Sequence, residues 1–157
     1  MKLLLQKLSR ALQREPDVAF AYLFGSTVTG RSGPLSDIDV AIYFHPSGSV
    51  RSRFKRRLQL TSKLSEAMNW DDIDLVPLQD APLDLARDIV ANGKLAFCHN
   101  NKLRVDFVFR VVRDYLDTEP VRKLEWEALT KHFENVSYGR TNRRPARAPE
   151  KASPNAG

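Results

Sequence analysis

The chain has 157 residues, of which 42% are hydrophobic and 28% charged, and its formal net charge is +6. This length fits one compact domain with a sizeable core, and the single cysteine, Cys98, excludes an internal disulfide framework. No apolar run approaches the roughly 18 residues of a membrane span. We therefore expect a cytoplasmic protein with no membrane segment, and the excess of positive charge favours a polyanionic or acidic partner.

The hydrophobic pattern predicts helices and strands in the order helix, strand, short helical turn, strand, helix, strand, helix, strand, helix, helix. Helical spacing of apolar residues and runs of β-branched and aromatic residues distinguish the two kinds of element. Helices are predicted over residues 2–14, 50–69, 82–92, 103–117 and 121–134, with a helical turn after Gly25. Strands are predicted over residues 18–24, 38–44, 73–78 and 95–98.

This order indicates an α/β (α+β) fold, a small mixed β-sheet flanked by helices. The apolar pattern stops close to Gly139, and prolines and arginines follow. We therefore predict a domain over residues 1–137 and a basic, disordered C-terminal tail over residues 138–157. Cys98, in an apolar stretch, is expected to be a buried small residue.

The predicted helix over residues 50–69 carries both an apolar stripe and a block of positive charge. The stripe follows helical spacing up to Asn69 and consists of Val50, Phe54, Leu58, Thr61, Leu64 and Met68. Six basic residues and no acidic one lie between residues 51 and 63. A solvated face is the simplest interpretation of this block, and contact with an acidic or RNA partner is the alternative.

Two aspartates mark the start of the second predicted strand. Asp37 and Asp39 are separated by one residue, so their side chains point to the same face, while Ile38 and Val40 point to the core. Carboxylates placed side by side repel each other unless a cation lies between them. Oxygen ligands of this kind suit magnesium or manganese.

A glycine and a serine end the preceding strand. Gly25 allows a phosphate to approach the backbone, and Ser26 adds a hydroxyl donor. If a helical turn starts at residue 26 or 27, its free N–H groups also face the phosphates. A phosphate-binding segment and a metal-binding pair are thus expected at neighbouring strand ends.

A third carboxylate is available at the start of the strand over residues 73–78. Asp74 lies between two apolar residues and is expected on the same side as Asp37 and Asp39. Asp72 has the same phase, so the spacing leaves the choice between them open and we prefer Asp74.

The segment Phe24-Gly25-Ser26, followed after ten residues by Asp37-Ile38-Asp39, resembles the G-S-x10-D-x-D signature of the DNA polymerase β-like nucleotidyltransferase superfamily. The context and the small size resemble its minimal nucleotidyltransferase (MNT) branch, which includes the MntA-type antitoxins of HEPN/MNT toxin–antitoxin modules. The resemblance covers residues 1–135.

The resemblance implies a two-metal mechanism. Asp37, Asp39 and Asp74 would ligate two Mg²⁺ ions, and Gly25 and Ser26 would hold the phosphates of ATP. The implied reaction is transfer of AMP from ATP to a tyrosine hydroxyl of a HEPN-domain RNase toxin, with which the chain would form a hetero-oligomer.

Two other functions stay open at this point. One is a catalytically idle antitoxin that neutralises its toxin by binding alone. The other is a nucleotidyltransferase that acts on a small-molecule hydroxyl, against which the lack of a second substrate domain argues. Retention of Ser26 and all three carboxylates favours an enzyme, and direct nucleic-acid binding is possible without being favoured.

Overall fold

The computed structural model describes residues 1–30, 37–45 and 49–141. The elements follow the predicted order: α1 (Lys2–Leu12), β1 (Val18–Phe24), α2 (Ser26–Thr29), β2 (Ile38–Phe44), α3 (Val50–Met68), β3 (Ile73–Pro77), α4 (Leu83–Asn92), β4 (Lys94–Cys98), α5 (Asn101–Asp117) and α6 (Glu119–Thr141). None of the helices in the described ranges combines the length and apolarity that crossing a bilayer requires.

The four strands form one mixed sheet in the order β3-β2-β1-β4. β1 runs antiparallel to both β2 and β4, whereas β2 runs parallel to β3. Because β2 and β3 are parallel, the start of β2 and the start of β3 meet at the same end of the sheet, where the end of antiparallel β1 also lies. The predicted mixed α/β architecture is confirmed.

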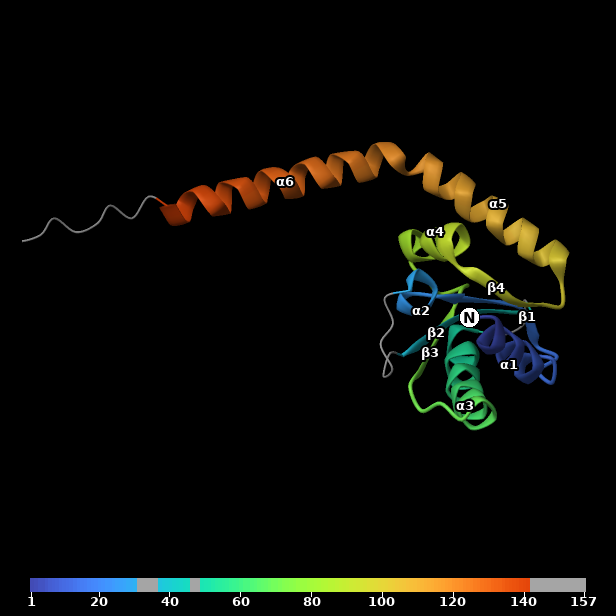
Figure 1. Cartoon of the computed structure of the whole chain (residues 1–157). Helices are drawn as coiled ribbons and strands as arrows, with labels where there is room; N and C mark the ends of the chain where they lie inside the picture. The colour runs from blue at the N-terminus through green and yellow to red at the C-terminus, as the bar shows by residue number, and fades with distance from the viewer. Residues whose placement is uncertain (31–36, 46–48, 142–157) are drawn as a thin grey trace, which may run out of the picture. The chain divides into compact units, whose positions relative to one another are not determined.

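Helices cover both faces of this sheet (Figure 1). The core on one face joins alternate residues of the strands to Leu8 and Leu12 of α1 and Leu60 and Leu64 of α3. The core on the other face joins the intervening residues to α4 and α5. Along β2, Ile38, Val40, Ile42 and Phe44 belong to the first core and Ala41 and Tyr43 to the second. Asp39 therefore lies on the face that α4 and α5 cover.

The chain divides after Asp117 into two units, 1–117 with the sheet and 118–157 with α6. The exposed apolar residues of α6 include Leu124, Trp126 and Phe133. α6 continues to Thr141, and residues 142–157 of the predicted tail lie outside the described residues. The predicted domain boundary at residue 137 stays a prediction.

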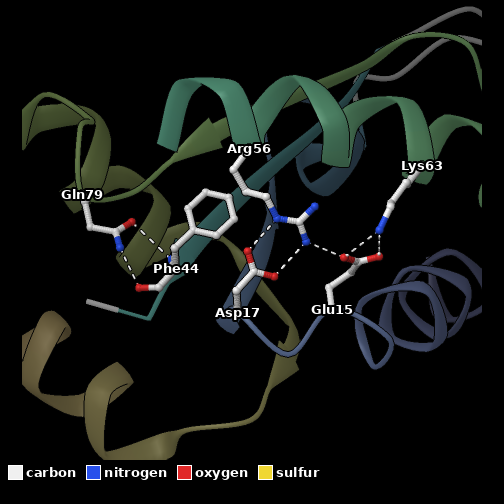
Figure 2. Close-up of polar contacts among 6 residues, drawn as sticks. All are labelled: Glu15, Asp17, Phe44, Arg56, Lys63 and Gln79. Atoms are coloured by element: carbon white, nitrogen blue, oxygen red, sulfur yellow. Dashed lines mark hydrogen bonds and ion pairs between the residues drawn. The ribbon is translucent and has the colours of Figure 1, made fainter. Parts of the chain in front are cut away.

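Ion pairs tie α3 to the segment that precedes β1 (Figure 2). Arg56 Nε donates to Asp17 Oδ2 over 2.6 Å, and Arg56 also pairs with Glu15. Lys63 Nζ lies 3.0 Å from Glu15 Oε1. Glu15 is only 8% exposed, so its charge is compatible with burial because two cations surround it.

Two further arginines of α3 bind acids on or after β3. Arg53 Nε donates to Asp80 Oδ2 over 2.9 Å, and Arg57 Nη2 lies 3.2 Å from Asp74 Oδ1. The interpretation of the basic block as a solvated face is therefore wrong for Arg53 and Arg56, whose side chains are only 18% and 21% exposed. Arg57 and Lys63 are also paired with acids but remain open to solvent.

The predicted apolar stripe of α3 is correct only in its C-terminal half. Leu64 and Met68 are buried, but Val50, Phe54 and Leu58 are more than half exposed. The reason is that Arg53 and Arg56 occupy the inward face of the N-terminal half, where they form ion pairs with acids of the adjacent loops. Repeating apolar residues alone do not reveal which side of a helix such ion pairs will turn inward.

A glutamine side chain extends the hydrogen bonding at the end of β2. Beyond β3, the Gln79 side chain pairs with both backbone groups of Phe44: Nε2 donates to the carbonyl over 2.7 Å, and Oε1 accepts from the N–H over 3.3 Å (Figure 2).

Cys98 is exposed, so its predicted burial is wrong. It ends β4, which is an edge strand and is covered less completely than β1 or β2.

Candidate active site

Three aspartates lie at the end of the sheet where β2 and β3 begin. Asp39 and Asp74 are direct partners in the parallel register of β2 and β3. Asp37 immediately precedes β2 and is exposed. The register thus puts Asp74 next to Asp39. The backbone carbonyl of Asp72, the other candidate, accepts from the Ile38 N–H over 2.9 Å, so Asp72 also lies beside the start of β2.

Gly25 brings the end of β1 against the Asp39 carboxylate. Its φ of 71° lies in the left-handed region, which residues with a side chain rarely adopt. A Cβ atom at this position would lie 1.9 Å from Asp39 Oδ2, which is far inside van der Waals contact. Glycine is therefore required here twice, by its backbone conformation and by the close approach of the carboxylate.

The short helix α2 starts at Ser26 and holds the loop before β2. The N–H groups of Val28 and Thr29 donate to the Gly25 carbonyl over 3.2 and 3.3 Å. The Thr27 hydroxyl donates to the Asp37 carbonyl over 3.2 Å. Ser26 and Asp37, with ten residues between them in the sequence, are thereby kept at one end of the sheet.

The carboxylates at this end repel one another. Partial burial raises the pKa of Asp39, and the negative charges of Asp74 and Asp37 raise it further. A hydrogen bond from the Ser26 backbone N–H acts in the opposite direction and does not offset the rise. Arg57, which reaches Asp74 from α3, is the only cation whose ion pair with these three aspartates is seen in the described ranges.

The donor set fits a hard divalent cation. Carboxylate oxygens are the ligands that Mg²⁺ and Mn²⁺ prefer, and a cation would remove the repulsion that raises the pKa of Asp39. Across the described part of the chain, however, no three acidic, histidine or cysteine side chains are gathered closely enough to hold a metal ion. The backbone register thus places the aspartates at the same end of the sheet, but their side chains do not converge into a three-ligand metal site.

Arg57 is the residue that the sequence did not single out. Its side chain is 37% exposed and that of Asp74 is 54% exposed, so the pair is open to solvent. A basic residue on a helical surface carries no signal by itself. Only the packing of α3 beside β3 shows that this arginine, 17 residues before Asp74, reaches it.

Comparisons with known proteins agree with this geometry. The sequence profile of the family described as "Polymerase beta, Nucleotidyltransferase" matches residues 6–102, more than half of the chain. The protein adenylyltransferase MntA of Shewanella oneidensis is 34% identical over 79 residues, which make up 50% of this chain and 53% of that protein. The match thus spans about half the length of this curated relative.

Solved structures extend the similarity to most of the fold. A toxin–antitoxin crystal structure with AMP-PNP superposes with a TM-score of 0.65 and 25% identity, covering 80% of this chain and 98% of the other. A tri-AMPylated Shewanella oneidensis HEPN toxin in complex with MNT antitoxin includes a chain with a TM-score of 0.59 and 25% identity, covering 83% of this chain and 99% of that one. With the matched profile and the paired aspartates beside Gly25, the chain belongs to the polymerase beta nucleotidyltransferase family.

Proposed function

We propose that this chain is an antitoxin nucleotidyltransferase that transfers AMP from ATP to a tyrosine hydroxyl of a cognate HEPN toxin and so neutralises it. The observation that carries the proposal is the direct pairing of Asp39 with Asp74 at the strand end that Gly25 approaches. The similarity to a protein adenylyltransferase and to an antitoxin chain beside an AMPylated toxin supports the same reaction and acceptor.

Each site residue has a part in this reaction. Gly25 and Ser26 would bind the β- and γ-phosphates, since glycine leaves the backbone open to them and serine supplies a donor. Asp37, Asp39 and Asp74 would hold two Mg²⁺ ions. Bound Mg²⁺ supplies Lewis-acid stabilisation of the charge on the attacking and leaving oxygens.

The bond changes follow from in-line displacement. The tyrosine oxygen attacks the α-phosphorus, its proton is released, and a new phosphorus–oxygen bond forms as the bond to the bridging oxygen breaks. That electron pair leaves with pyrophosphate. The protein contributes chiefly by holding both reactants in line and by placing fixed charge beside them.

A whole protein is the acceptor that best fits the openness of the site. Asp74 lies on β3, an edge strand, and its side chain is 54% exposed. An acceptor tyrosine on a folded partner can reach such an edge without entering an enclosed pocket. A small-molecule hydroxyl, the alternative acceptor, would meet few enclosing side chains among the residues that the structure describes.

The reaction is tested by mass spectrometry of the cognate HEPN toxin after incubation with this protein, ATP and Mg²⁺. The expected result is a mass gain of one or more AMP units on a tyrosine, absent with Asp37→Asn, which should remain folded. Tight complex formation without any mass gain would instead support the idle antitoxin that acts by binding alone. Retained Mg²⁺-dependent transfer by Asp37→Asn would contradict the assigned site.

A further inference from the structure

The cations of α3 fall into two groups with different surroundings. Four of the six basic residues between 51 and 63 are paired with acids of the sheet and its loops. Arg51 and Lys55 form no ion pair within the described residues. The sequence itself holds no acid from residue 40 to 65, so none is available on the helix near them. Ion pairs that stabilise the fold thus explain the positive charge of the first group, whereas Arg51 and Lys55 have no such role in the described structure.

The same stretch exposes three large apolar side chains. Val50, Phe54 and Leu58 are 64%, 56% and 53% exposed, and a spacing of four residues aligns them on one helical face. A shallow groove of about 420 Å³ runs along this face. Its lining residues are Ser49, Arg51, Ser52, Phe54, Lys55 and Leu58. A contiguous exposed apolar surface with a polar rim is typical of a protein interaction site.

The rim charge indicates what kind of partner fits. Arg51 and Lys55 border the apolar stripe, and two like charges four residues apart repel each other on an isolated helix. Carboxylates on a partner would relieve this repulsion. Nucleic-acid interfaces are more polar and much more positively charged than three apolar side chains with two cations. The surface therefore fits a protein segment with apolar residues between acidic ones.

Only the C-terminal end of this surface approaches the proposed active site, because Phe54 lies toward the opposite end of the sheet, where Arg53 pairs with Asp80 and Arg56 with Asp17. Leu58 follows Arg57, whose Nη2 atom lies 3.2 Å from Asp74 Oδ1. The ion pairs of the opposite side hold the helix against the body of the protein, so its outer face is a fixed platform. Since α3 packs beside β3, a protein that covers this surface and extends past Leu58 would reach the edge strand that carries Asp74.

We propose that this outer face, made of Val50, Arg51, Phe54, Lys55 and Leu58, is the docking surface for the acceptor protein of the transfer reaction. The contacting segment of the acceptor presents apolar side chains with an acidic rim. This inference rests on the proposed function, but the surface and the carboxylates can be tested separately because they share no residue.

The experiment measures AMP transfer to the cognate HEPN toxin as a function of toxin concentration for wild type, Phe54→Glu and Lys55→Glu. Phe109→Glu is the matched control, since Phe109 is 69% exposed on α5. The docking variants should raise the toxin concentration for half-maximal rate by about tenfold or more, because an anchor residue at an interface is worth at least that factor. The maximal rate, the melting temperature and the binding of a fluorescent ATP analogue should stay as in wild type and in Phe109→Glu.

Each outcome separates docking from catalysis. Wild-type concentration dependence in both docking variants would overturn the docking surface and leave the transfer reaction standing. A wild-type complex that forms without AMP transfer, and that Phe54→Glu disrupts, would overturn the reaction and retain the surface. If the variants keep toxin binding but lose binding of a fluorescent single-stranded RNA, the surface is a nucleic-acid site and the proposal is wrong.

Discussion

Two acidic clusters in this protein have opposite electrostatics. Near the start of β1, Glu15 and Asp17 are surrounded by Arg56 and Lys63, and these cations lower the pKa of both carboxyls. At the other end of the sheet, burial and neighbouring negative charges raise the pKa of Asp39. The first cluster is neutralised within the chain, whereas the second keeps an excess of negative charge among the described residues.

The two clusters show that ion pairs which stabilise the fold and carboxylates that remain unneutralised lie in different parts of the protein. A cluster whose charges are paired within the fold contributes to its stability and needs no ligand. A cluster that keeps its repulsion lowers the stability of the fold, and a bound cation would relieve that repulsion. The close fit of Gly25 against Asp39 shows that the second arrangement is built into the backbone.

Asp39→Asn should have the largest effect. We expect AMP transfer to fall by about a thousandfold or more, because the variant loses a charge that would stabilise the transition state. The free energy of unfolding should rise by about 1 kcal/mol, since the repulsion is relieved. Transfer assays and urea denaturation check the two effects, with Asp84→Asn on α4 as a control for loss of an exposed acid. Equal activity in the two variants would remove Asp39 from the site.

Gly25→Ala tests the contact between the end of β1 and Asp39. Gly25 and Gly30 both have positive φ, 71° and 73°, but only a Cβ at residue 25 would meet the carboxylate. Both alanine variants should lose about 1–2 kcal/mol of stability through backbone strain. Only Gly25→Ala should displace Asp39 and abolish transfer, as measured alongside thermal melts. A similar loss of activity in Gly30→Ala would mean that strain alone explains the result.

Arg56→Met should break the neutralised cluster. It leaves Glu15 and Asp17 without their shared cation, and we expect a loss of about 2 kcal/mol in the free energy of unfolding. This is below the cost for a fully buried pair because the Asp17 side chain is 40% exposed and water screens it. Arg51→Met, which removes an arginine that forms no ion pair within the described residues, is the control and should change stability by less than about 0.5 kcal/mol.

The pH dependence of that destabilisation should be smaller and has a definite sign. Burial opposes ionisation of Glu15, but hydrogen bonds from Arg56 and Lys63 take its pKa below the ordinary value of 4.5. A lowered folded pKa means that the stabilisation is present above the ordinary value and is lost as the pH falls through the folded one. The stability difference between wild type and Arg56→Met should therefore be constant near neutral pH and shrink below pH 4.5. A difference that grows on acidification would contradict the ion pairs.

Features that depend on local sequence and on hydrophobic periodicity could be predicted from the sequence. The order of elements and the phase that turns Ile38 and Val40 to the core are confirmed by the structure. The register that pairs Asp39 with Asp74 agrees with the expected placement of the third carboxylate, while the catalytic and metal-binding roles remain proposals.

Features that depend on distant partners could not be predicted. Arg56 pairs with acids 39 and 41 residues away, so its inward orientation depends on how the sheet is assembled. The same assembly turns Phe54 outward against the apolar periodicity. Cys98 is exposed because β4 is an edge strand, a fact of strand order that its apolar neighbours do not encode.

The repelling carboxylates should bind a divalent metal together with nucleotide. Binding of Mn²⁺ followed by electron paramagnetic resonance, with and without a non-hydrolysable ATP analogue, tests it without relying on turnover. We predict saturable Mn²⁺ binding by wild type that the analogue strengthens and that Asp39→Asn abolishes. Equal Mn²⁺ binding by wild type and Asp39→Asn, or none by wild type in the presence of the analogue, would mean that these carboxylates do not form a metal site.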